Sequence, residues 1–411
     1  MKANQTRIEQ HINQLSKFTA TPGAGVTRLT YSTEDLDARN YIKEKMTAYG
    51  LTVSEDGFGN IFGKLAGTIP LAPSIIVGSH FDSVPNGGAY DGTAGVVVGL
   101  EVAALFQESG CTPTYPLEII ALVEEEGSRF SGGLMGSRGM MGLLTDSDFK
   151  SLADKDGILA EDAMLSIGLD PVKEKRRDPK TIKAFLELHI EQGPVLEEKN
   201  IPIGFVEAIV GLTQLEITIQ GQAGHAGTTP MNRRSDALVT AAQIIAEFPH
   251  IALEEGNGTV ITTGRLQVYP NGANVIPDKV VFSVDIRAAR EEHVQNAARK
   301  VEQLITSKNG GGILTASERL LYIAPKQMDQ KVQSLLRETT NKLGIPHCSI
   351  NSGAGHDAMV FSDFTACGMI FIPSKGGLSH CPEEWSDMKH LTDGATILYQ
   401  TALQLTEEEQ L

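Results

Sequence analysis

The chain has few cysteines and no long apolar run, and each shortage excludes a class of protein. Its 411 residues include four cysteines that lie far apart and form no CxxC pair: Cys111, Cys348, Cys367 and Cys381. Such cysteines fit a reducing compartment. No apolar run approaches the roughly 20 residues that span a bilayer, and residues 1–15 lack the apolar core of a secretory signal. We therefore expect a cytoplasmic protein.

Positive charge is scarce as well. The chain has 35 lysines and arginines against 51 aspartates and glutamates, which gives a formal net charge of −16. Nucleic acid and anionic membranes repel such an acidic protein, so we expect neither as a partner. The length favours two or three domains, and a hydrophobic content of 41% is enough to bury a sizeable core.

Helix and strand signals alternate along the first half of the chain. This alternation predicts an α/β fold with a mixed sheet flanked by helices. Ser32 is expected to cap a helix that ends at Gly50. Residues 145–183 contain the charge run KEKRRD and are interpreted as a solvated helical insertion. The expected strands are residues 51–55, 61–65, 75–77 and 117–123.

Residues 211–327 follow a different pattern. Strands and helices alternate there in the order β-α-β-β-α-β, which is that of a ferredoxin-like split βαβ unit. The strands are expected at residues 215–220, 260–269, 280–288 and 313–321, and the helices at 235–248 and 293–307. The first pattern then resumes. We therefore predict a catalytic domain in two parts, 1–210 and 328–411, with an inserted ferredoxin-like α+β domain at 211–327.

Five residues that lie at strand ends or in the polar loops after them have the chemistry of metal ligands. They are His80, Asp91, Glu126, His189 and His380. Open α/β sheets place their sites at the carboxyl ends of strands. Imidazoles and carboxylates suit zinc or manganese, and cobalt or nickel also fit. The adjacent carboxylates of residues 124–126 would repel one another strongly when dry, and a bound cation relieves that repulsion.

Each of these residues also has an ordinary explanation, such as a packed core histidine or an Asp-Gly turn. Their joint occurrence favours a site with two metal ions. Asp91 is then the candidate bridge between the ions. His80 and His189 would complete the ligand set of the first ion, while Glu126 and His380 would complete that of the second.

Two further residues have predicted roles beside these ligands. Asp82 lies two positions after His80, where it can accept a hydrogen bond from an imidazole N–H. Glu125 is the candidate general base that takes a proton from water and returns it to the leaving nitrogen. Neighbouring side chains on a strand alternate faces, so Glu125 is expected to point away from Glu126.

These segments resemble the dinuclear aminoacylase/carboxypeptidase superfamily of metallohydrolases. Within it they are most similar to the ureido-hydrolysing branch of allantoate amidohydrolases, N-carbamoyl-L-amino-acid hydrolases and β-ureidopropionases. The motifs are GSHFDSVPNGGAYDG, EEEGSRF, ELHIEQGPVLE, GHAGTTPM, NVIPDKVVFSVDIR, SGAGHDAM and GLSHCPEEWS. The resemblance covers nearly the whole chain. It implies two divalent ions per subunit on the same five ligands, with Glu125 as the acid/base. Peptidase relatives usually have a carboxylate at the position of His189, which makes an aminoacylase or peptidase the weaker alternative.

The resemblance also implies a set of substrate contacts: Gln192, His225, Asn274, Arg287 and His356. Arg287 would grip a substrate carboxylate through its guanidinium fork. His225 would reach across a homodimer to stabilise the developing oxyanion. The ordinary alternatives are a strand-end salt bridge for Arg287, a turn residue for Asn274 and a loop histidine for His225. The inserted domain carries these three residues, so we expect it to serve as a lid and dimerisation domain.

The function predicted from the resemblance is hydrolysis of a linear ureido C–N bond in a small carboxylate substrate. SGAGHDAM, EEEGSRF and HAGTTPM resemble the allantoate enzymes, so allantoate, which would yield ureidoglycine, ammonia and carbon dioxide, is the first expectation. Residues 211–214 depart from the arginine-containing segment of some allantoate enzymes. This makes N-carbamoyl-L-amino acids the alternative. A scaffold that binds without catalysis is disfavoured, because all five ligands and Glu125 are present.

Overall fold

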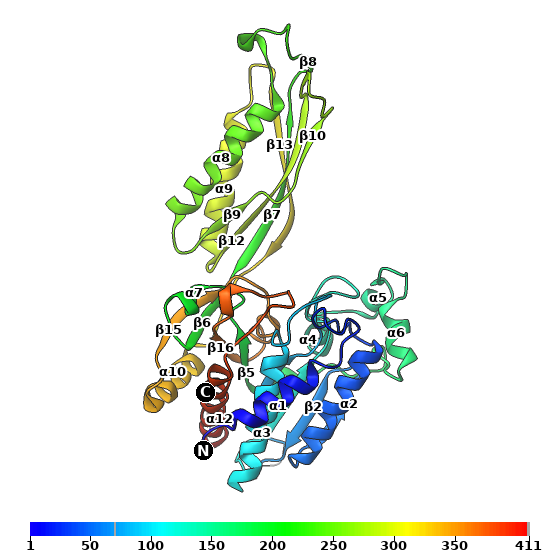
Figure 1. Cartoon of the computed structure of the whole chain (residues 1–411), viewed down its shortest axis with the longest axis vertical. Helices are drawn as coiled ribbons and strands as arrows, with labels where there is room; N and C mark the ends of the chain where they lie inside the picture. The colour runs from blue at the N-terminus through cyan, green and yellow to red at the C-terminus, as the bar shows by residue number, and fades with distance from the viewer. Residues whose placement is uncertain (70, 409–411) are drawn as a thin grey trace. The chain divides into compact units, whose positions relative to one another are not determined.

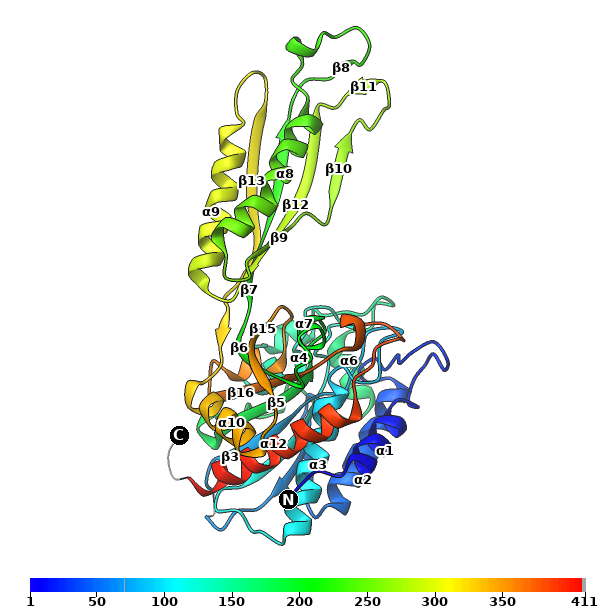
Figure 2. The same ribbon diagram turned by 60° about the vertical axis from the view of Figure 1, so that its left-hand side comes forward.

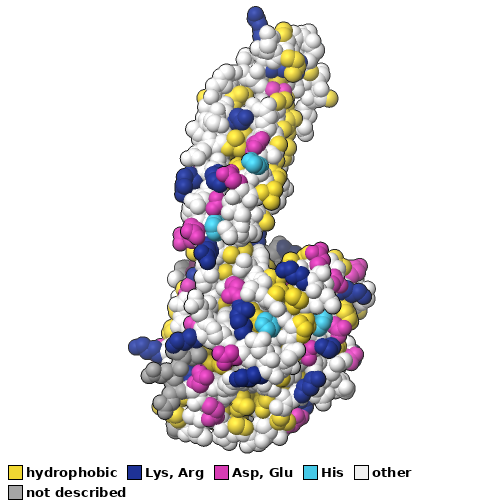
Figure 3. Space-filling model, turned by 90° about the vertical axis from the view of Figure 1, so that its left-hand side faces the viewer, with side chains coloured by type: hydrophobic (Ala, Val, Ile, Leu, Met, Phe, Trp, Pro, Cys, Tyr) yellow, Lys and Arg dark blue, Asp and Glu magenta, His cyan; other side chains and the backbone are white. Residues whose placement is uncertain are grey.

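The computed structural model describes residues 1–69 and 71–408. The chain forms two compact units. Unit 1 consists of Met1–Glu207, Met328–Ile350 and Gly355–Leu411, and unit 2 consists of Ala208–Gln327 and Asn351–Ala354. No helix within the described ranges is long and apolar enough to cross a membrane. On the face drawn in Figure 3, lysine and arginine side chains are interspersed with aspartate and glutamate.

A mixed sheet runs through unit 1 (Figure 1). Among the described residues its nine strands have the order β1-β2-β4-β3-β5-β16-β6-β14, and β15 pairs with β6. Strands β4, β3, β5 and β16 are neighbours and run parallel. The strands are β1 (Thr52–Glu55), β2 (Ile61–Leu65), β3 (Ser74–His80), β4 (Leu117–Leu122), β5 (Ile182–Ile190), β6 (Ile203–Ile209), β14 (Lys326–Gln327), β15 (His347–Ser352) and β16 (Ala366–Ile372).

Helices cover both faces of this sheet, as Figure 2 shows. On β5, Leu186 and Leu188 pack into a core shared with α1, α2, α3, α10 and α12. Phe185 points to the opposite face and stacks on Phe361 of α11, with ring centroids 4.1 Å apart. The helices are α1 (Gln5–Leu15), α2 (Thr33–Ala48), α3 (Thr93–Ser109), α4 (Met135–Met140), α5 (Asp146–Phe149), α6 (Ala160–Ser166), α7 (Val195–Glu198), α10 (Gln330–Leu343), α11 (Asp357–Phe361) and α12 (Met388–Glu407), with 3₁₀ turns η1 (Pro179–Thr181) and η3 (Lys375–Gly377).

The predicted fold class, a mixed sheet flanked by helices, is confirmed by this arrangement. The cap of α2 is also as expected, because the Ser32 hydroxyl accepts a hydrogen bond from the Asp35 N–H. Burial on both faces explains why the parallel strands are almost continuously apolar in sequence.

Residues 145–183 differ from the predicted solvated helix. Within them only α5, α6 and η1 are helical, and the charge run at 173–178 is not. The Arg176 guanidinium lies 4.5 Å from the ring centroid of Phe58. Arg177 pairs at 3.0 Å with Glu118, whose side chain is only 3% exposed. The run is therefore partly a packing element, because a buried carboxylate needs a cationic partner.

Unit 2 contains an antiparallel sheet with two helices packed on one face (Figure 2). Its strand order is β10-β12-β7-β13, with β9 paired to β12. A small pair, β8 and β11, lies apart from this sheet. The elements are β7 (Gly211–Gln220), β8 (Gly224–His225), η2 (Met231–Arg233), α8 (Ala237–Glu255), β9 (Val260–Thr262), β10 (Leu266–Tyr269), β11 (Val275–Ile276), β12 (Lys279–Ala288), α9 (Glu291–Ser307) and β13 (Leu314–Ile323).

Two boundaries expected in this region are wrong. The strand expected at 260–269 is broken into β9 and β10, with Gly264 in the gap. The helix expected to end at residue 248 continues through Pro249 to Glu255. Its start is set by Asp236, whose carboxylate accepts hydrogen bonds from two N–H groups of the first turn.

The packing on β5 yields a stability prediction. Phe185→Ala removes a fully buried ring and should lower the free energy of unfolding by about 3 to 5 kcal/mol. Urea unfolding followed by circular dichroism measures the change. Leu165, which is 49% exposed in the same unit, provides the control, since Leu165→Ala should cost about 0.5 kcal/mol or less. Equal losses in the two variants would contradict the prediction.

Candidate metal and active site

Four neighbouring parallel strands bring the predicted ligands to one edge of the sheet in unit 1. His80 is the last residue of β3, and His189 is the next-to-last residue of β5. Glu126 follows β4, and His380 follows β16. Because the strands run parallel, their carboxyl ends meet at the same edge. Residues as much as 300 positions apart thereby become neighbours.

Asp91, in the loop before α3, lies between two groups of candidate ligands. The ligand atoms of His80, Asp91 and His189 lie within 4.8 Å of one another, as do those of Asp91, Glu126 and His380. Asp91 Oδ1 is 3.7 Å from His80 Nε2 and 3.1 Å from His189 Nε2. Asp91 Oδ2 is 3.1 Å from His380 Nε2. One carboxylate oxygen thus faces each group.

The two buried imidazoles have fixed orientations. His189 Nδ1 lies 2.9 Å from the Ile190 carbonyl oxygen, so its N–H donates there. His80 Nδ1 lies 3.4 Å from Asp82 Oδ1. With the proton on Nδ1, each Nε2 presents a lone pair towards Asp91. Asp82 therefore has the position that the sequence assigned to it beside His80.

The three glutamates are not on a strand, contrary to the sequence prediction. Strand β4 ends at Leu122, and Glu124 adopts a φ of +52° in the loop that follows. The Glu124 carboxylate accepts hydrogen bonds from the N–H groups of Arg129 and Phe130. Glu124 is therefore a loop-stabilising residue, and the alternation of strand faces does not apply here.

The turn of this loop sends Glu125 and Glu126 to different imidazoles. Glu125 Oε2 lies 3.8 Å from His80 Nε2, and Glu126 Oε1 lies 3.4 Å from His380 Nε2. The carboxylate of Asp82 accepts the backbone N–H groups of both glutamates, at 3.1 and 3.2 Å. The two side chains thus point to different imidazoles because of the loop, and not because of strand alternation.

The electrostatics of this edge fit a divalent cation. Burial, reinforced by the nearby Asp91 carboxylate, raises the pKa of Glu126 to about 7. A hydrogen bond to Asp91 raises the pKa of His380 to about 9, and burial raises the pKa of Glu125 well above its usual value. Negative charge is therefore concentrated here beyond what the imidazoles neutralise. Glu126 Oε1 is buried without a hydrogen-bond partner among the described residues. Such a donor set suits zinc or manganese.

Position 92 of this site requires glycine. Its φ is +58°, and an added Cβ would lie 2.2 Å from Cε1 of the His80 ring. Its N–H also points at His189 Nε2, at 3.2 Å. The backbone of Gly92 therefore lies so close to both imidazoles that there is no room for a side chain.

Two of the predicted substrate contacts lie at the same edge. Gln192 Nε2 donates to Asp91 Oδ2 at 2.9 Å and is 3.3 Å from His380 Nε2. The ring of His356 lies 4.4 Å from that of His189, centroid to centroid. Burial holds the pKa of His356 well below its usual value, so this imidazole is neutral.

The other three predicted contacts belong to unit 2. His225 on β8 pairs with Val275 on β11, and the Ala226 N–H donates to the Asn274 carbonyl, so His225 and Asn274 are close neighbours. Arg287 on β12 is separate from this pair. Its guanidinium forms a 2.8 Å ion pair with Asp285 and donates at 2.9 Å to the Gly353 carbonyl.

Sequence analysis missed Glu384, four residues after His380. Its buried carboxylate accepts hydrogen bonds from the N–H groups of Tyr90 and Asp91, at 2.9 and 3.0 Å. It also accepts one from the Ser379 hydroxyl, at 2.8 Å. Glu384 thus ties the loop of Asp91 to the loop of His380. The two adjacent acidic residues in CPEEWS were the available signal, but nothing local distinguishes the buried one.

Comparison with known proteins identifies the family of this chain. Residues 76–404 match the model of Peptidase family M20/M25/M40, and the chain belongs to this family. It is 43% identical to an N-carbamoyl-L-amino-acid amidohydrolase of Paenarthrobacter aurescens, with 97% of each chain covered. It is 36% identical to an allantoate amidohydrolase of Bacillus subtilis (strain 168), with 95% of each covered. A solved amidase of the hydantoinase/carbamoylase family from Burkholderia multivorans is similar over 99% of each chain, with a TM-score of 0.90 and 33% identity.

These relatives confirm the superfamily and the branch that the motifs predicted. The chain is a hydrolase that acts on carbon–nitrogen bonds other than peptide bonds. Its family is metal-dependent, and the two groups around Asp91 are the candidate places for the metal.

The close approach of Gly92 yields a prediction about metal binding. Gly92→Ala should reduce the metal retained per chain after dialysis, measured by mass spectrometry, because the new methyl group displaces the His80 ring. Gly110→Ala is the matched control: Gly110 has a φ of +64° and no neighbouring atom within 4 Å of an added Cβ. Equal metal retention in the two variants would contradict the prediction, because the contact with His80 would then have no effect on binding.

Glu384 yields a second prediction. Glu384 also accepts the His380 N–H, which makes four hydrogen bonds. In Glu384→Gln an amide nitrogen that donates replaces an oxygen that accepts, so at least one of the four is lost. Metal affinity, measured by competition with a chelating dye, should fall about tenfold to a hundredfold. The exposed neighbour Glu383 gives the control, and Glu383→Gln should leave the affinity unchanged. An unchanged metal affinity in Glu384→Gln would show that Glu384 does not position the candidate ligands.

Proposed function

We propose that the two ligand groups hold two divalent ions, zinc or manganese with cobalt or nickel as alternatives, and that Asp91 bridges them. The observation that carries this proposal is the division of its carboxylate, with Oδ1 towards His80 and His189 and Oδ2 towards His380. Bound divalent ions would polarise a carbonyl oxygen and lower the pKa of water, which is the chemistry needed to cleave a stable C–N bond.

Glu125 is the proposed acid/base. Its carboxylate is buried beside His80, and both burial and the surrounding carboxylates favour its protonated form. In its ionised form this carboxylate would take a proton from the attacking water, and the protonated form would then give that proton to the leaving nitrogen. Asp82 has a positioning role, since it accepts the Glu125 N–H and faces His80.

The surroundings of Arg287 support a carboxylate substrate with an apolar side chain. Cross-strand pairing aligns Val260 on β9, Arg287 on β12, Leu212 on β7 and Ile323 on β13 in one row. Directly opposite residues lie on the same face of a sheet. The guanidinium therefore has an aliphatic side chain on each side. A substrate that presents a carboxylate next to an aliphatic group would match this row.

An N-carbamoyl-L-amino acid has this combination, and we propose this class as the substrate. Hydrolysis would yield the amino acid, ammonia and carbon dioxide. The relative named for this substrate is 43% identical to the chain, against 36% for the relative named for allantoate. Allantoate, which the sequence motifs favoured, is the second candidate, because SGAGHDAM, EEEGSRF and HAGTTPM resemble the allantoate enzymes.

The remaining roles are proposed on the family resemblance. Gln192 and His356 would contact the substrate from unit 1, and His225 and Asn274 from unit 2. His225 would stabilise the developing oxyanion. The domain at 211–327 would act as a lid and form a homodimer, and the protein would work in the cytoplasm.

A substrate panel tests the function. Ammonia release is measured from allantoate, N-carbamoylglycine, N-carbamoyl-L-leucine and 3-ureidopropionate, with manganese added. N-carbamoyl-L-leucine should have the highest kcat/KM, because its side chain contacts the apolar row beside Arg287. If only allantoate were turned over, allantoate would replace N-carbamoyl-L-amino acids as the proposed substrate. Rapid cleavage of N-acetyl or peptide substrates with no ureido hydrolysis would overturn the proposed function.

Glu125→Gln tests the acid/base role. The amide cannot carry the proton, so kcat should fall about 100-fold to 10,000-fold. KM and bound metal, measured on the same preparation, should change little, because Glu125 is not among the five ligands. If metal content fell in step with kcat, Glu125 would be a ligand rather than a proton carrier.

A further inference from the structure

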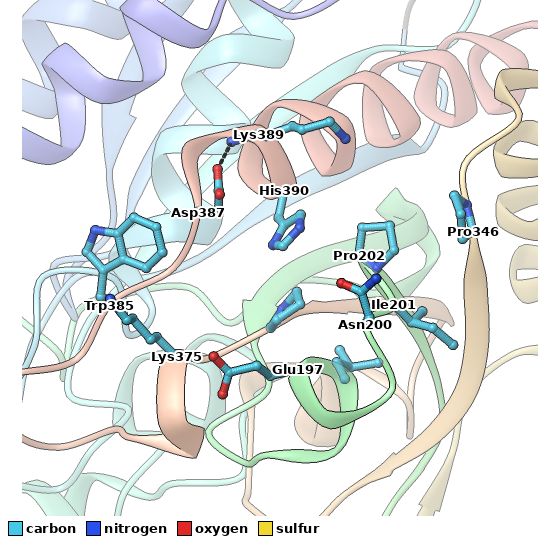
Figure 4. A pocket seen from close by; sticks show the side chains of 12 residues that line it. Glu197, Asn200, Ile201, Pro202, Pro346, Lys375, Trp385, Asp387, Lys389 and His390 are labelled. Carbon is cyan, nitrogen blue, oxygen red and sulfur yellow. Dashed lines mark hydrogen bonds between the residues drawn. The ribbon is translucent and has the colours of Figure 1, made fainter.

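Unit 1 has a cavity of about 440 Å³ that the proposed catalytic site does not use (Figure 4). It contains none of the metal ligands or substrate contacts. Ile201, Pro202 and Pro346 lie on one side of the cavity, and Lys375 and Trp385 lie together on another side. Leu196 adds a further apolar side chain to the lining. Its volume falls within the range of small-molecule sites.

Four charged side chains line this cavity, Glu197, Lys375, Asp387 and Lys389, and Lys375 is the candidate to pair with a ligand. Its ammonium lies 5.2 Å from the centroid of the Trp385 ring, and across residues 1–69 and 71–408 it has no ion pair. The carboxylates nearby are occupied by backbone donors, since Glu197 accepts the Gly376 N–H and Asp387 accepts the Lys389 N–H. One cation is therefore available at the edge of an apolar surface.

The other lining lysine does not offer the same charge. Lys389 forms a 2.8 Å ion pair with Asp393 on the next turn of α12. Asp387 is the cap of α12 and points its carboxylate at that helix. An anionic ligand would thus have a single preferred position for its charge, next to Lys375, while its apolar part faces the prolines and Ile201.

We propose that this cavity is a second binding site, for a small carboxylate with an aliphatic or aromatic tail. The carboxylate pairs with Lys375, and the tail packs on the wall of Leu196, Ile201, Pro202 and Pro346. Ion pairing with an exposed lysine is weak by itself, so the tail supplies most of the affinity and the charge supplies the selectivity.

The cavity also lies at the base of the loop that carries His380. The Lys375 N–H donates at 2.9 Å to the Trp385 carbonyl and so closes the loop between these residues. Ser379, His380 and Glu384 lie within it. A ligand on Lys375 and Trp385 therefore contacts both ends of a segment that reaches the catalytic site.

The chain offers a direct probe, because Trp385 is its single tryptophan and is 42% exposed. The metal-loaded protein is titrated with phenylbutyrate, with its neutral amide and with butyrate, while Trp385 fluorescence is recorded. Phenylbutyrate should give a saturable change, the amide should bind about twofold to fivefold more weakly, and butyrate should give no saturable change.

Lys375→Gln separates this site from any other. In that variant phenylbutyrate should bind no more tightly than its amide. The control is Lys17→Gln, which changes an exposed lysine elsewhere in unit 1. This control should bind phenylbutyrate as tightly as the unchanged protein does. The proposal is overturned if phenylbutyrate gives no saturable change, if the amide binds equally well, or if Lys375→Gln binds phenylbutyrate normally. Each of these readouts is independent of the hydrolytic activity.

Discussion

The parallel pairing of β4, β3, β5 and β16 is the constraint on which the site depends. The register sets His80 opposite Leu122 and His189 opposite Phe371. Side chains alternate faces along a strand, so a slip of one residue on β5 would turn His189 into the core that now holds Leu188. The apolar burial of these strands therefore fixes the ligand geometry before any ion binds.

The loops at this edge are held in costly conformations. Glu124, Gln192 and His380 have φ values of +52°, +57° and +57°. Such backbone costs about 1 to 3 kcal/mol per residue and persists only where the surroundings stabilise it. Asp82 does so for the loop of Glu124, and Glu384 does so for the loop of His380, because each carboxylate accepts N–H groups from that loop. The Gln192 N–H donates to the Ser374 hydroxyl. The acidic residues thus serve structure as well as chemistry.

The sequence could predict what depends on local signals. An apolar strand followed by a polar, glycine-rich loop identified His80 and His189, and these residues do lie at strand ends. The prediction that strand alternation separates Glu125 from Glu126 was wrong. A strand pattern in the sequence does not reveal that Glu124, after β4, adopts a left-handed backbone conformation. Glu384 could not be found, since its partners Tyr90 and Asp91 lie more than 290 positions away. Contacts between distant loops leave no periodicity to detect.

The division of the chain would place the proposed chemistry and the proposed substrate choice in different units. All five candidate ligands lie in unit 1, whereas Arg287 and Leu212 lie in unit 2. Leu212 occupies the segment that departs from some allantoate enzymes, and it stands directly opposite Arg287. A change at that one strand position would alter what surrounds the guanidinium without moving a metal ligand. On the proposed roles, substitutions in unit 2 could change the substrate while the candidate ligands in unit 1 stay in place.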